Sequence, residues 1–238
     1  MKENSILSKI TQASNLLGIL IDPDKYLSVS ELEQVVKDVQ KIAPDFLFVG
    51  GSLINHNLMD EMVKLFKTRL SIPVVLFPGN NQQISSKADA ILLLSLISGR
   101  NAELLIGQHV QSAFILQKSG LEIIPTGYLL IDGEKKTSVQ YISNSQPIPN
   151  DKNNIAVATA LAGEQLGLKL IYLDAGSGAN KAVPLEMVRT VQEHLQVPII
   201  VGGGIKTKEQ IKETWKAGAN LVIVGTAFEK NPKNLFKN

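Results

Sequence analysis

The chain has 238 residues, of which 44% are hydrophobic and 19% charged, and its formal net charge is +2. Because the lysines are scattered and the charge is nearly balanced, the sequence lacks the basic patch typical of nucleic-acid-binding proteins. Cysteine is absent, which excludes disulfides, thiolate metal sites and cysteine nucleophiles and fits a cytoplasmic protein. No segment has the pattern of a signal peptide or of a span of about 20 apolar residues, so we expect a soluble protein.

Short apolar runs rich in Ile, Val and Leu alternate with amphipathic stretches along the chain. This alternation is typical of βαβ units around a parallel sheet, whose strands are buried on both faces. The predicted strands are Leu17–Asp22, Phe46–Gly50, Val74–Phe77, Ala90–Leu96, Glu122–Leu130, Leu170–Asp174, Ile199–Gly202 and Leu221–Gly225. The predicted helices are Val29–Ile42, Leu58–Arg69, Ala102–Lys118, Ile155–Leu166, Leu185–Leu195 and Lys208–Ala217, with room for a short one in Pro78–Lys87.

Eight strand–helix units in a chain of this length predict a (β/α)8 barrel, or TIM barrel, formed as a single domain by residues 1–238. A doubly wound open sheet is the alternative, which the strand count separates only weakly from a barrel. Residues Ile131–Asn154 break the rhythm because they are polar and contain prolines. We expect this segment to form an extended loop over the active-site face, with a small hairpin as one option.

Glycine-rich turns follow the last three predicted strands, within Tyr172–Ala179, Gly202–Ile205 and Gly225–Ala227. A phosphate held by backbone N–H groups favours glycine, since a Cβ would block close approach and many of the required φ angles are positive. One such turn is as readily structural, but three together match the phosphate site that many barrels build at this place. Ser177 and Thr226 would add hydroxyl donors. The pattern predicts a phosphate site at the C-terminal ends of strands six to eight.

Two polar side chains follow the first two predicted strands. Asp22 ends the first strand and Ser52 follows the second. Neighbouring parallel strands lie about 4.8 Å apart, so these side chains can share a hard cation such as Mg²⁺, which takes few protein oxygens beside substrate phosphates. The competing role for Asp22 is a helix N-cap or turn residue before Pro23. Asp24 fits that capping role better, which leaves Asp22 for the metal.

Asp174 ends the sixth predicted strand beside the phosphate loop. It is a candidate general base, with a loop-organising carboxylate as the alternative. Tyr172 points to the same side of the strand and can orient a substrate, unless it only lines the barrel. Arg100 is a candidate partner for a diphosphate, although a single loop arginine is more often simply exposed. We assign no catalytic role to the histidines His56, His109 and His194.

Taken together, the segments Leu20–Lys25, Phe48–Ser52, Tyr172–Ala179, Val201–Ile205 and Val224–Ala227 resemble the geranylgeranylglyceryl phosphate synthase family, which includes the bacterial PcrB proteins. The resemblance runs in order over essentially the whole chain. The tyrosine-x-acid-Ala-Gly-Ser-Gly-Ala element is its specific part, while the triple glycine and the Gly-Thr pair occur in many phosphate-binding barrels.

The resemblance implies transfer of a prenyl chain, with geranylgeranyl expected, from a prenyl diphosphate to the 3-hydroxyl of sn-glycerol 1-phosphate. The product would be an ether-lipid precursor. It implies Mg²⁺ at Asp22 and Ser52, and the diphosphate candidates are Lys25 and Arg100. The residues it implies for glycerol phosphate are Tyr172, Leu173, Asp174, Ala175, Gly176, Ser177, Gly178, Gly203, Gly204, Gly225 and Thr226.

The chain departs from the family pattern at two positions. Many relatives have glutamate where this chain has Asp174, and some have lysine where it has Leu20, for which Lys25 is a candidate replacement. Both differences are typical of a separate branch of the family. Candidate residues for a groove that would hold the prenyl tail are Phe77, Leu94, Tyr128 and Leu130.

Two other functions remain open from the residues alone. A sugar-phosphate isomerase or an aldolase can use the same phosphate site, although the lysines nearest to strand ends, Lys25 and Lys206, lie in predicted loops. A non-catalytic phosphate sensor is disfavoured by the joint presence of Asp22, Ser52 and Asp174. We expect no nucleic-acid partner, at most peripheral membrane contact through the prenyl product, and a homo-oligomer.

Overall fold

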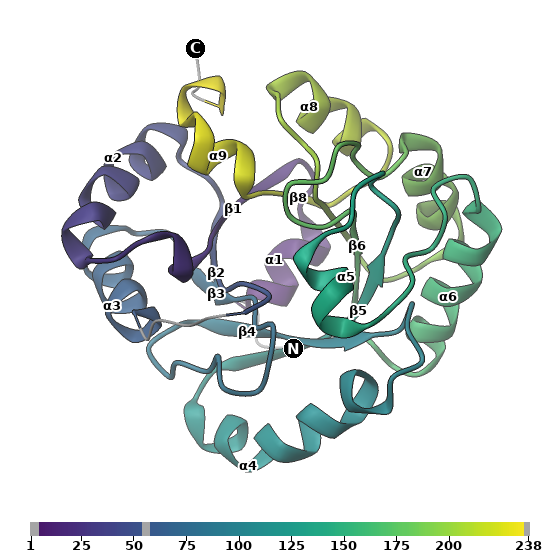
Figure 1. Cartoon of the computed structure of the whole chain (residues 1–238), viewed down its shortest axis with the longest axis horizontal. Helices are drawn as coiled ribbons and strands as arrows, with labels where there is room; N and C mark the ends of the chain where they lie inside the picture. The colour runs from purple at the N-terminus through teal and green to yellow at the C-terminus, as the bar shows by residue number, and fades with distance from the viewer. Residues whose placement is uncertain (1–4, 54–57, 236–238) are drawn as a thin grey trace.

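The computed structural model describes residues 5–53 and 58–235, and His56 lies outside these residues. Eight parallel strands close into a barrel in the order β1 to β8 (Figure 1), so the fold is the predicted (β/α)8 barrel and the open-sheet alternative is wrong. The strands are β1 Leu16–Ile21, β2 Phe46–Val49, β3 Val74–Leu76, β4 Ala90–Leu96, β5 Glu122–Leu130, β6 Leu170–Asp174, β7 Ile199–Gly202 and β8 Leu221–Val224.

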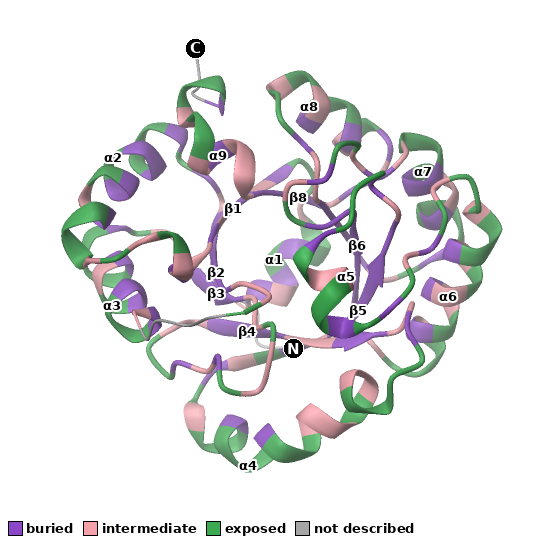
Figure 2. Ribbon diagram, in the orientation of Figure 1, coloured by how far each residue is buried: buried purple, intermediate pink, exposed green. Residues whose placement is uncertain are grey.

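Alternate residues of each strand face the inside of the barrel and the surrounding helices, because side chains of a strand alternate between its two faces. The inner positions form a packed cluster that includes Phe46, Phe48, Tyr128, Tyr172 and Ile223. The outer positions pack with the helices in a second, larger cluster. Figure 2 shows the buried strands inside a ring of helices whose outer faces are exposed. The barrel interior is therefore a core rather than a pore.

The six predicted helices are present, with some differences at their starts. Val29–Ile42 divides into a 3-10 turn, Val29–Glu31, and α2. The helix predicted from Ala102 opens instead with a π-helical turn, Glu103–Gly107, before α4 begins. The α-helices are α1 Ile6–Gln12, α2 Leu32–Ile42, α3 Met59–Arg69, α4 Gln108–Ser119, α5 Ser138–Ser143, α6 Asn153–Gln165, α7 Leu185–His194, α8 Lys208–Lys216 and α9 Thr226–Lys230.

Helix α1, which the sequence pattern did not predict, packs against the interior of the barrel. Ile6 and Ile10 join the inner cluster, and the N–H groups of Ile6 and Leu7 donate to the Glu122 carboxylate at 2.7 and 2.9 Å. Glu122 begins β5, so α1 covers the N-terminal end of the strands (Figure 1). A substrate can therefore enter from the opposite, C-terminal end.

The segment Ile131–Asn154 is the predicted loop over the C-terminal face, but it contains α5 and a parallel bridge between Ile131 and Ile148 instead of a hairpin. The segment Pro78–Lys87 contains turns and no helix. Within it, the buried Gln83 side chain accepts from the Gly79 N–H at 3.0 Å. In the described part of the chain, no helix is both long and apolar enough to cross a membrane.

Candidate active site

A cavity of about 720 Å³ lies at the C-terminal ends of the strands, between the loops that follow them. Most of the predicted site residues line it. These are Asp22, Lys25, Ser52, Tyr172, Asp174, Ser177, Gly178, Gly203, Gly204, Gly225 and Thr226. Four others do not, namely Leu173, Ala175, Gly176 and Arg100. The fold thus brings together residues from both ends of the chain around one space.

Asp174 is a buried carboxylate in the wall of the cavity. It is 7% exposed, its Oδ2 accepts from the Tyr128 hydroxyl at 2.5 Å, and its Oδ1 accepts from the Gly176 N–H at 2.8 Å. Burial raises the pKa of this carboxyl, while the hydrogen bonds from Tyr128 and Gly176 oppose the rise. A carboxylate with a raised pKa that lines a cavity is suited to accept a proton at neutral pH.

An aromatic cluster supports Asp174. The Tyr172 ring lies 5.5 Å from the Tyr128 ring and 5.4 Å from that of Phe77, measured between centroids. Tyr128 and Tyr172 are direct neighbours in the β5–β6 register, so both hydroxyls belong to the same layer of the barrel. Burial raises the pKa of both tyrosines well above the usual value, which keeps them neutral hydrogen-bond donors.

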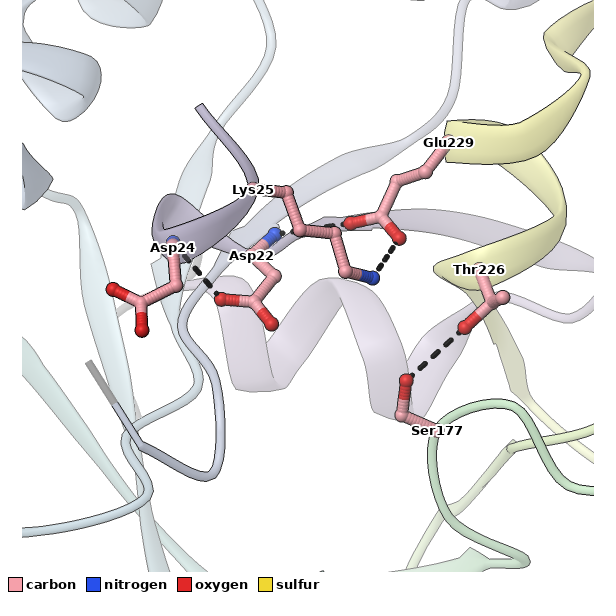
Figure 3. Close-up of polar contacts among 6 residues, drawn as sticks. All are labelled: Asp22, Asp24, Lys25, Ser177, Thr226 and Glu229. Carbon is pink, nitrogen blue, oxygen red and sulfur yellow. Dashed lines mark hydrogen bonds and ion pairs between the residues drawn. The ribbon is translucent and has the colours of Figure 1, made fainter. Parts of the chain in front are cut away.

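The glycine-rich loops after β6, β7 and β8 form one wall of the cavity. The Ser177 hydroxyl lies 3.1 Å from the Thr226 hydroxyl, which joins the loop after β6 to the start of α9 (Figure 3). Backbone φ angles in the left-handed region occur at Gly176, Gly178, Gly203 and Gly204, as predicted, whereas Gly225 has φ −111°. Glycines without a Cβ and two hydroxyls thus line one part of the cavity, a combination typical of phosphate sites.

Three predicted site residues at the end of β6 and the start of the loop after it do not line the cavity but lie behind its wall. Leu173 and Ala175 are buried in the outer cluster between strands and helices, so their side chains face away from the cavity. Gly176 contributes the N–H that holds Asp174. The alternation of β6 explains this arrangement, since Tyr172 and Asp174 occupy the inner positions and Leu173 the outer one.

At the opposite wall, Asp22 and Ser52 line the cavity as predicted. The expectation that Asp24 serves as the cap is wrong. Asp22 caps the short 3-10 helix Pro23–Lys25 with Oδ1, which accepts from the Asp24 N–H at 3.2 Å (Figure 3). Gly51 lies against both carboxylate oxygens, since a Cβ there would come within 2.6 Å of Oδ1 and 3.1 Å of Oδ2. The missing side chain of Gly51 leaves space beside the carboxylate.

The two diphosphate candidates differ in position. Lys25 lines the cavity, and its ammonium group forms an ion pair with Glu229 of α9, whose side chain is 9% exposed. Glu229 also accepts from the Asp22 N–H at 3.4 Å. Arg100 lies away from the cavity lining and donates to the carbonyls of Ile97 and Gly99 at 3.1 and 2.7 Å. The fold therefore brings Lys25, and not Arg100, to the site.

Between these walls the cavity has an apolar section. Of the groove candidates, Phe77, Leu94 and Tyr128 line it, whereas Leu130 is buried in the barrel core. Additional apolar lining comes from Leu96, Leu104, Val139 and Ile142. Val139 and Ile142 belong to α5, so the polar loop predicted over the active-site face contributes apolar side chains to the cavity.

Several hydrogen bonds around the cavity could not be predicted from the sequence pattern. Lys135 donates to the Gly178 carbonyl at 3.2 Å and Lys206 to the Asn180 carbonyl at 3.1 Å, so two ammonium groups flank the loop after β6. Gln83 bonds to both the N–H and the carbonyl of Gly51 and fixes the loop after β2. These residues are distant in sequence from their partners, so only the fold reveals the contacts.

Replacing Tyr128 by phenylalanine should displace the acid limb of the pH–rate profile to higher pH. Tyr128 donates to the Asp174 carboxylate and lowers its pKa, so loss of the hydroxyl should raise that pKa further. A general base acts when deprotonated, so with Asp174 in that role a higher pH would be needed for the same activity. The measurement is kcat/KM against pH, with Tyr141→Phe as control because Tyr141 is 86% exposed. An unmoved acid limb would contradict the role of this hydrogen bond.

The comparisons with known proteins agree with this geometry. The PcrB family model matches residues 9–238. Geranylgeranylglyceryl phosphate synthase from Chitinophaga pinensis is 50% identical over 227 residues, which cover 95% of this chain and 90% of the relative. The protein of the same name from Thermococcus gammatolerans is 42% identical over 213 residues, which cover 89% and 83% of the two chains.

Among solved structures, (S)-3-O-geranylgeranylglyceryl phosphate synthase from Thermoplasma acidophilum, in complex with its substrate sn-glycerol-1-phosphate, superimposes with a TM-score of 0.91. It is 33% identical in sequence, and the alignment covers 97% of this chain and 95% of that one. The family model and these relatives extend over nearly the whole barrel, including both walls of the cavity. The chain belongs to the PcrB family.

Proposed function

We propose that this chain is a Mg²⁺-dependent prenyltransferase that joins a prenyl diphosphate, with geranylgeranyl diphosphate as the expected donor, to the 3-hydroxyl of sn-glycerol 1-phosphate. The observation that carries the proposal is one cavity that combines a glycine-rich anion-binding wall, the buried carboxylate of Asp174 and an apolar section. The relatives' names and the bound sn-glycerol-1-phosphate of the Thermoplasma protein support the same reaction.

Glycerol phosphate binds with its phosphate against the loops at Ser177, Gly203, Gly204 and Thr226. The phosphate acts as a handle that fixes the attacking oxygen, which removes much of the orientational freedom of the reaction. The 3-hydroxyl then lies toward Asp174, whose carboxylate accepts its proton. Tyr128 and Tyr172, which lie beside that carboxylate, orient it and the glycerol.

The residues present at the other wall fit a magnesium ion. Mg²⁺ usually binds through one or two carboxylates together with substrate phosphates and water rather than in a full protein cage. The described residues contain no cluster of three or more His, Cys, Asp or Glu side chains placed to hold a metal, so the ion would depend on substrate phosphates and water for most of its ligands. Asp22 and Ser52 would hold the ion, and Gly51 leaves the space beside the carboxylate. When bound, Mg²⁺ neutralises charge on the leaving diphosphate.

In the proposed reaction, the allylic C–O bond of the prenyl diphosphate breaks and its electron pair leaves with the diphosphate. The 3-oxygen of glycerol phosphate forms the new C–O bond to the same carbon, and its proton passes to Asp174. Lys25 stabilises the departing diphosphate. The apolar section beside Phe77, Leu94 and Leu104 holds the prenyl tail. A sugar-phosphate isomerase would leave this apolar section unused, and a sensor would not need the buried base.

The proposal predicts labelled lipid from labelled sn-glycerol 1-phosphate when geranylgeranyl diphosphate and Mg²⁺ are supplied. The measurement is radioactivity that becomes extractable into organic solvent, with shorter prenyl diphosphates in parallel. Asp22→Ala should remove nearly all of it, because the ion would lose its only proposed carboxylate ligand. Binding of glycerol phosphate without product from any prenyl donor would contradict the transferase and leave a phosphate-binding barrel.

We further propose that copies of the chain associate through α4 and the turn before it. Ile106, Val110 and Phe114 recur one helical turn apart and are 58%, 66% and 76% exposed. Such a contiguous apolar surface is typical of an interaction site. Trp215, by contrast, packs on the core and donates to the Leu16 carbonyl at 2.9 Å.

Light scattering after size-exclusion chromatography should accordingly give a mass of at least two chains. Phe114→Asp should reduce it to one chain, because a charge on this surface would have to be desolvated in the interface. Leu166→Asp is the matched control, since Leu166 is 81% exposed at the end of α6. A monomeric unmodified protein, or equal behaviour of the two variants, would contradict assembly through α4.

A further inference from the structure

The proposed diphosphate wall of the cavity is formed by the loop after β1 and by α9. It is more acidic than a diphosphate ligand would suggest. Three carboxylates line it, from Asp22, Asp24 and Glu229, against the ammonium groups of Lys25 and Lys230. A diphosphate is multiply negative and would be expected to select a basic wall. The excess of carboxylates therefore needs a reason beyond binding one magnesium ion.

Glu229 is the least explained of the three carboxylates. It lies in α9, one turn after Thr226, and its side chain is 9% exposed. It forms an ion pair with Lys25, which comes from the loop after β1, 204 positions earlier in the chain. Figure 3 shows this contact and the Ser177–Thr226 contact on the same side of Asp22, with Asp24 on the other side. Glu229 thus holds Lys25, the lysine that we propose contacts the diphosphate, in an ion pair.

We propose that Glu229 is a specificity-determining residue that makes diphosphate binding depend on magnesium. While Glu229 holds Lys25, the wall carries an excess of negative charge, and a bare diphosphate is repelled. A diphosphate that arrives with Mg²⁺ brings its own positive charge and finds Asp22 and Ser52 as ligands. The ion pair therefore excludes metal-free anions that would otherwise block the cavity. This inference rests on the proposed function of the same site.

The test is calorimetric titration of inorganic pyrophosphate, once with MgCl₂ and once with EDTA. The ratio of the two dissociation constants measures the magnesium dependence. Glu229→Gln keeps an oxygen for the Asp22 N–H but releases Lys25 from its ion pair. This variant should bind metal-free pyrophosphate at least tenfold more tightly than the unmodified protein, about 1.4 kcal/mol, and the ratio should fall accordingly.

The matched control is Glu134→Gln. Glu134 also forms an ion pair with a lysine, Lys181, at 2.8 Å, and neither residue lines the cavity. This variant changes the net charge by the same amount and frees a lysine in the same way. Its magnesium dependence should stay within twofold of the unmodified protein. An equal gain in both glutamine variants would assign the effect to overall charge and overturn the proposal.

Two further variants test whether the effect passes through Lys25. Lys25→Met should make binding more dependent on magnesium, the opposite of Glu229→Gln, because the wall loses positive charge. In the double variant Glu229→Gln/Lys25→Met, the gain in affinity for metal-free pyrophosphate should disappear. If that gain persisted, it would contradict the proposal that Glu229 acts by holding Lys25. If Glu229→Gln lost pyrophosphate binding equally with and without magnesium, Glu229 would only support α9, and the proposal would be wrong. Titration of this variant with sn-glycerol 1-phosphate reports directly on whether α9 is still in place.

These outcomes separate this inference from the proposed function. An unmodified protein that fails to bind pyrophosphate even with magnesium would count against the diphosphate site itself. Normal binding by the unmodified protein, with an unchanged ratio in Glu229→Gln, would count only against the role of Glu229.

Discussion

Asp174→Asn should lower kcat by about 10² to 10⁴-fold, the range by which positioned acid–base groups accelerate reactions. The asparagine has nearly the same shape, and its amide oxygen can still accept from the Gly176 N–H. It cannot take up the proton of the glycerol 3-hydroxyl at neutral pH. Because the phosphate contacts are untouched, the dissociation constant for sn-glycerol 1-phosphate should stay within about threefold.

The control for this variant is Asp132→Asn. Asp132 follows β5, accepts from the Glu134 N–H at 2.9 Å and does not line the cavity. It should retain full activity. Single-turnover kinetics distinguishes loss of chemistry from slow product release. An Asp174→Asn enzyme within tenfold of the unmodified rate would show that another group, or solvent, removes the proton.

Gly203→Ala should weaken binding of sn-glycerol 1-phosphate by at least 100-fold, roughly 3 kcal/mol. A Cβ at this position would lie 2.5 Å from Asp174 Oδ1 and 2.6 Å from the Gly176 nitrogen. These atoms belong to β6 and the loop after it, which form the proposed phosphate wall, so they must move. The backbone also has φ +77°, which adds about 1 kcal/mol of strain for alanine.

The control variant Gly120→Ala separates the effect of backbone strain from the effect of the steric clash. Gly120 has φ +76°, but a Cβ there would meet nothing within 4 Å. This control should lose stability by about 1 kcal/mol and keep its affinity for glycerol phosphate. Thermal unfolding and calorimetry on both variants provide the comparison. Equal affinities in the two alanine variants would contradict the phosphate site at Gly203.

The strands could be predicted from the sequence to within one residue at either end. In a parallel barrel each strand is buried on both faces, so it appears as a continuous apolar run such as Phe46–Val49. The glycine-rich loops could be predicted for a related reason, since close backbone approach and positive φ impose glycine itself. These features follow from local constraints on individual residues and their sequence neighbours.

The short helices could not be predicted in the same way. Helix α1 has seven residues and α5 has six, too few for a helical period to stand out from a loop. Both are stabilised by distant partners, as in the contact of α1 with Glu122. Tertiary packing, rather than local propensity, decides their structure.

The contacts that tune the site also depend on the fold. Tyr128 and Asp174 are 46 positions apart, and nothing in the β5 pattern distinguishes Tyr128 from an ordinary core aromatic. The register that pairs Tyr128 with Tyr172 creates the contact. Likewise, Arg100 and Lys25 look equivalent as loop cations, but only Lys25 reaches the cavity. Sequence patterns predicted the loops that line the cavity, and the fold determines which side chains of other segments reach it.

The central claim is that the 3-oxygen of sn-glycerol 1-phosphate becomes the ether oxygen of the product. The most direct measurement uses sn-glycerol 1-phosphate labelled with ¹⁸O at that hydroxyl, incubated with geranylgeranyl diphosphate and Mg²⁺. Mass spectrometry should find the label in the lipid product and none in the released diphosphate. Label in the diphosphate, or a lipid without it, would mean that a different bond is formed and would contradict prenyl transfer to this hydroxyl.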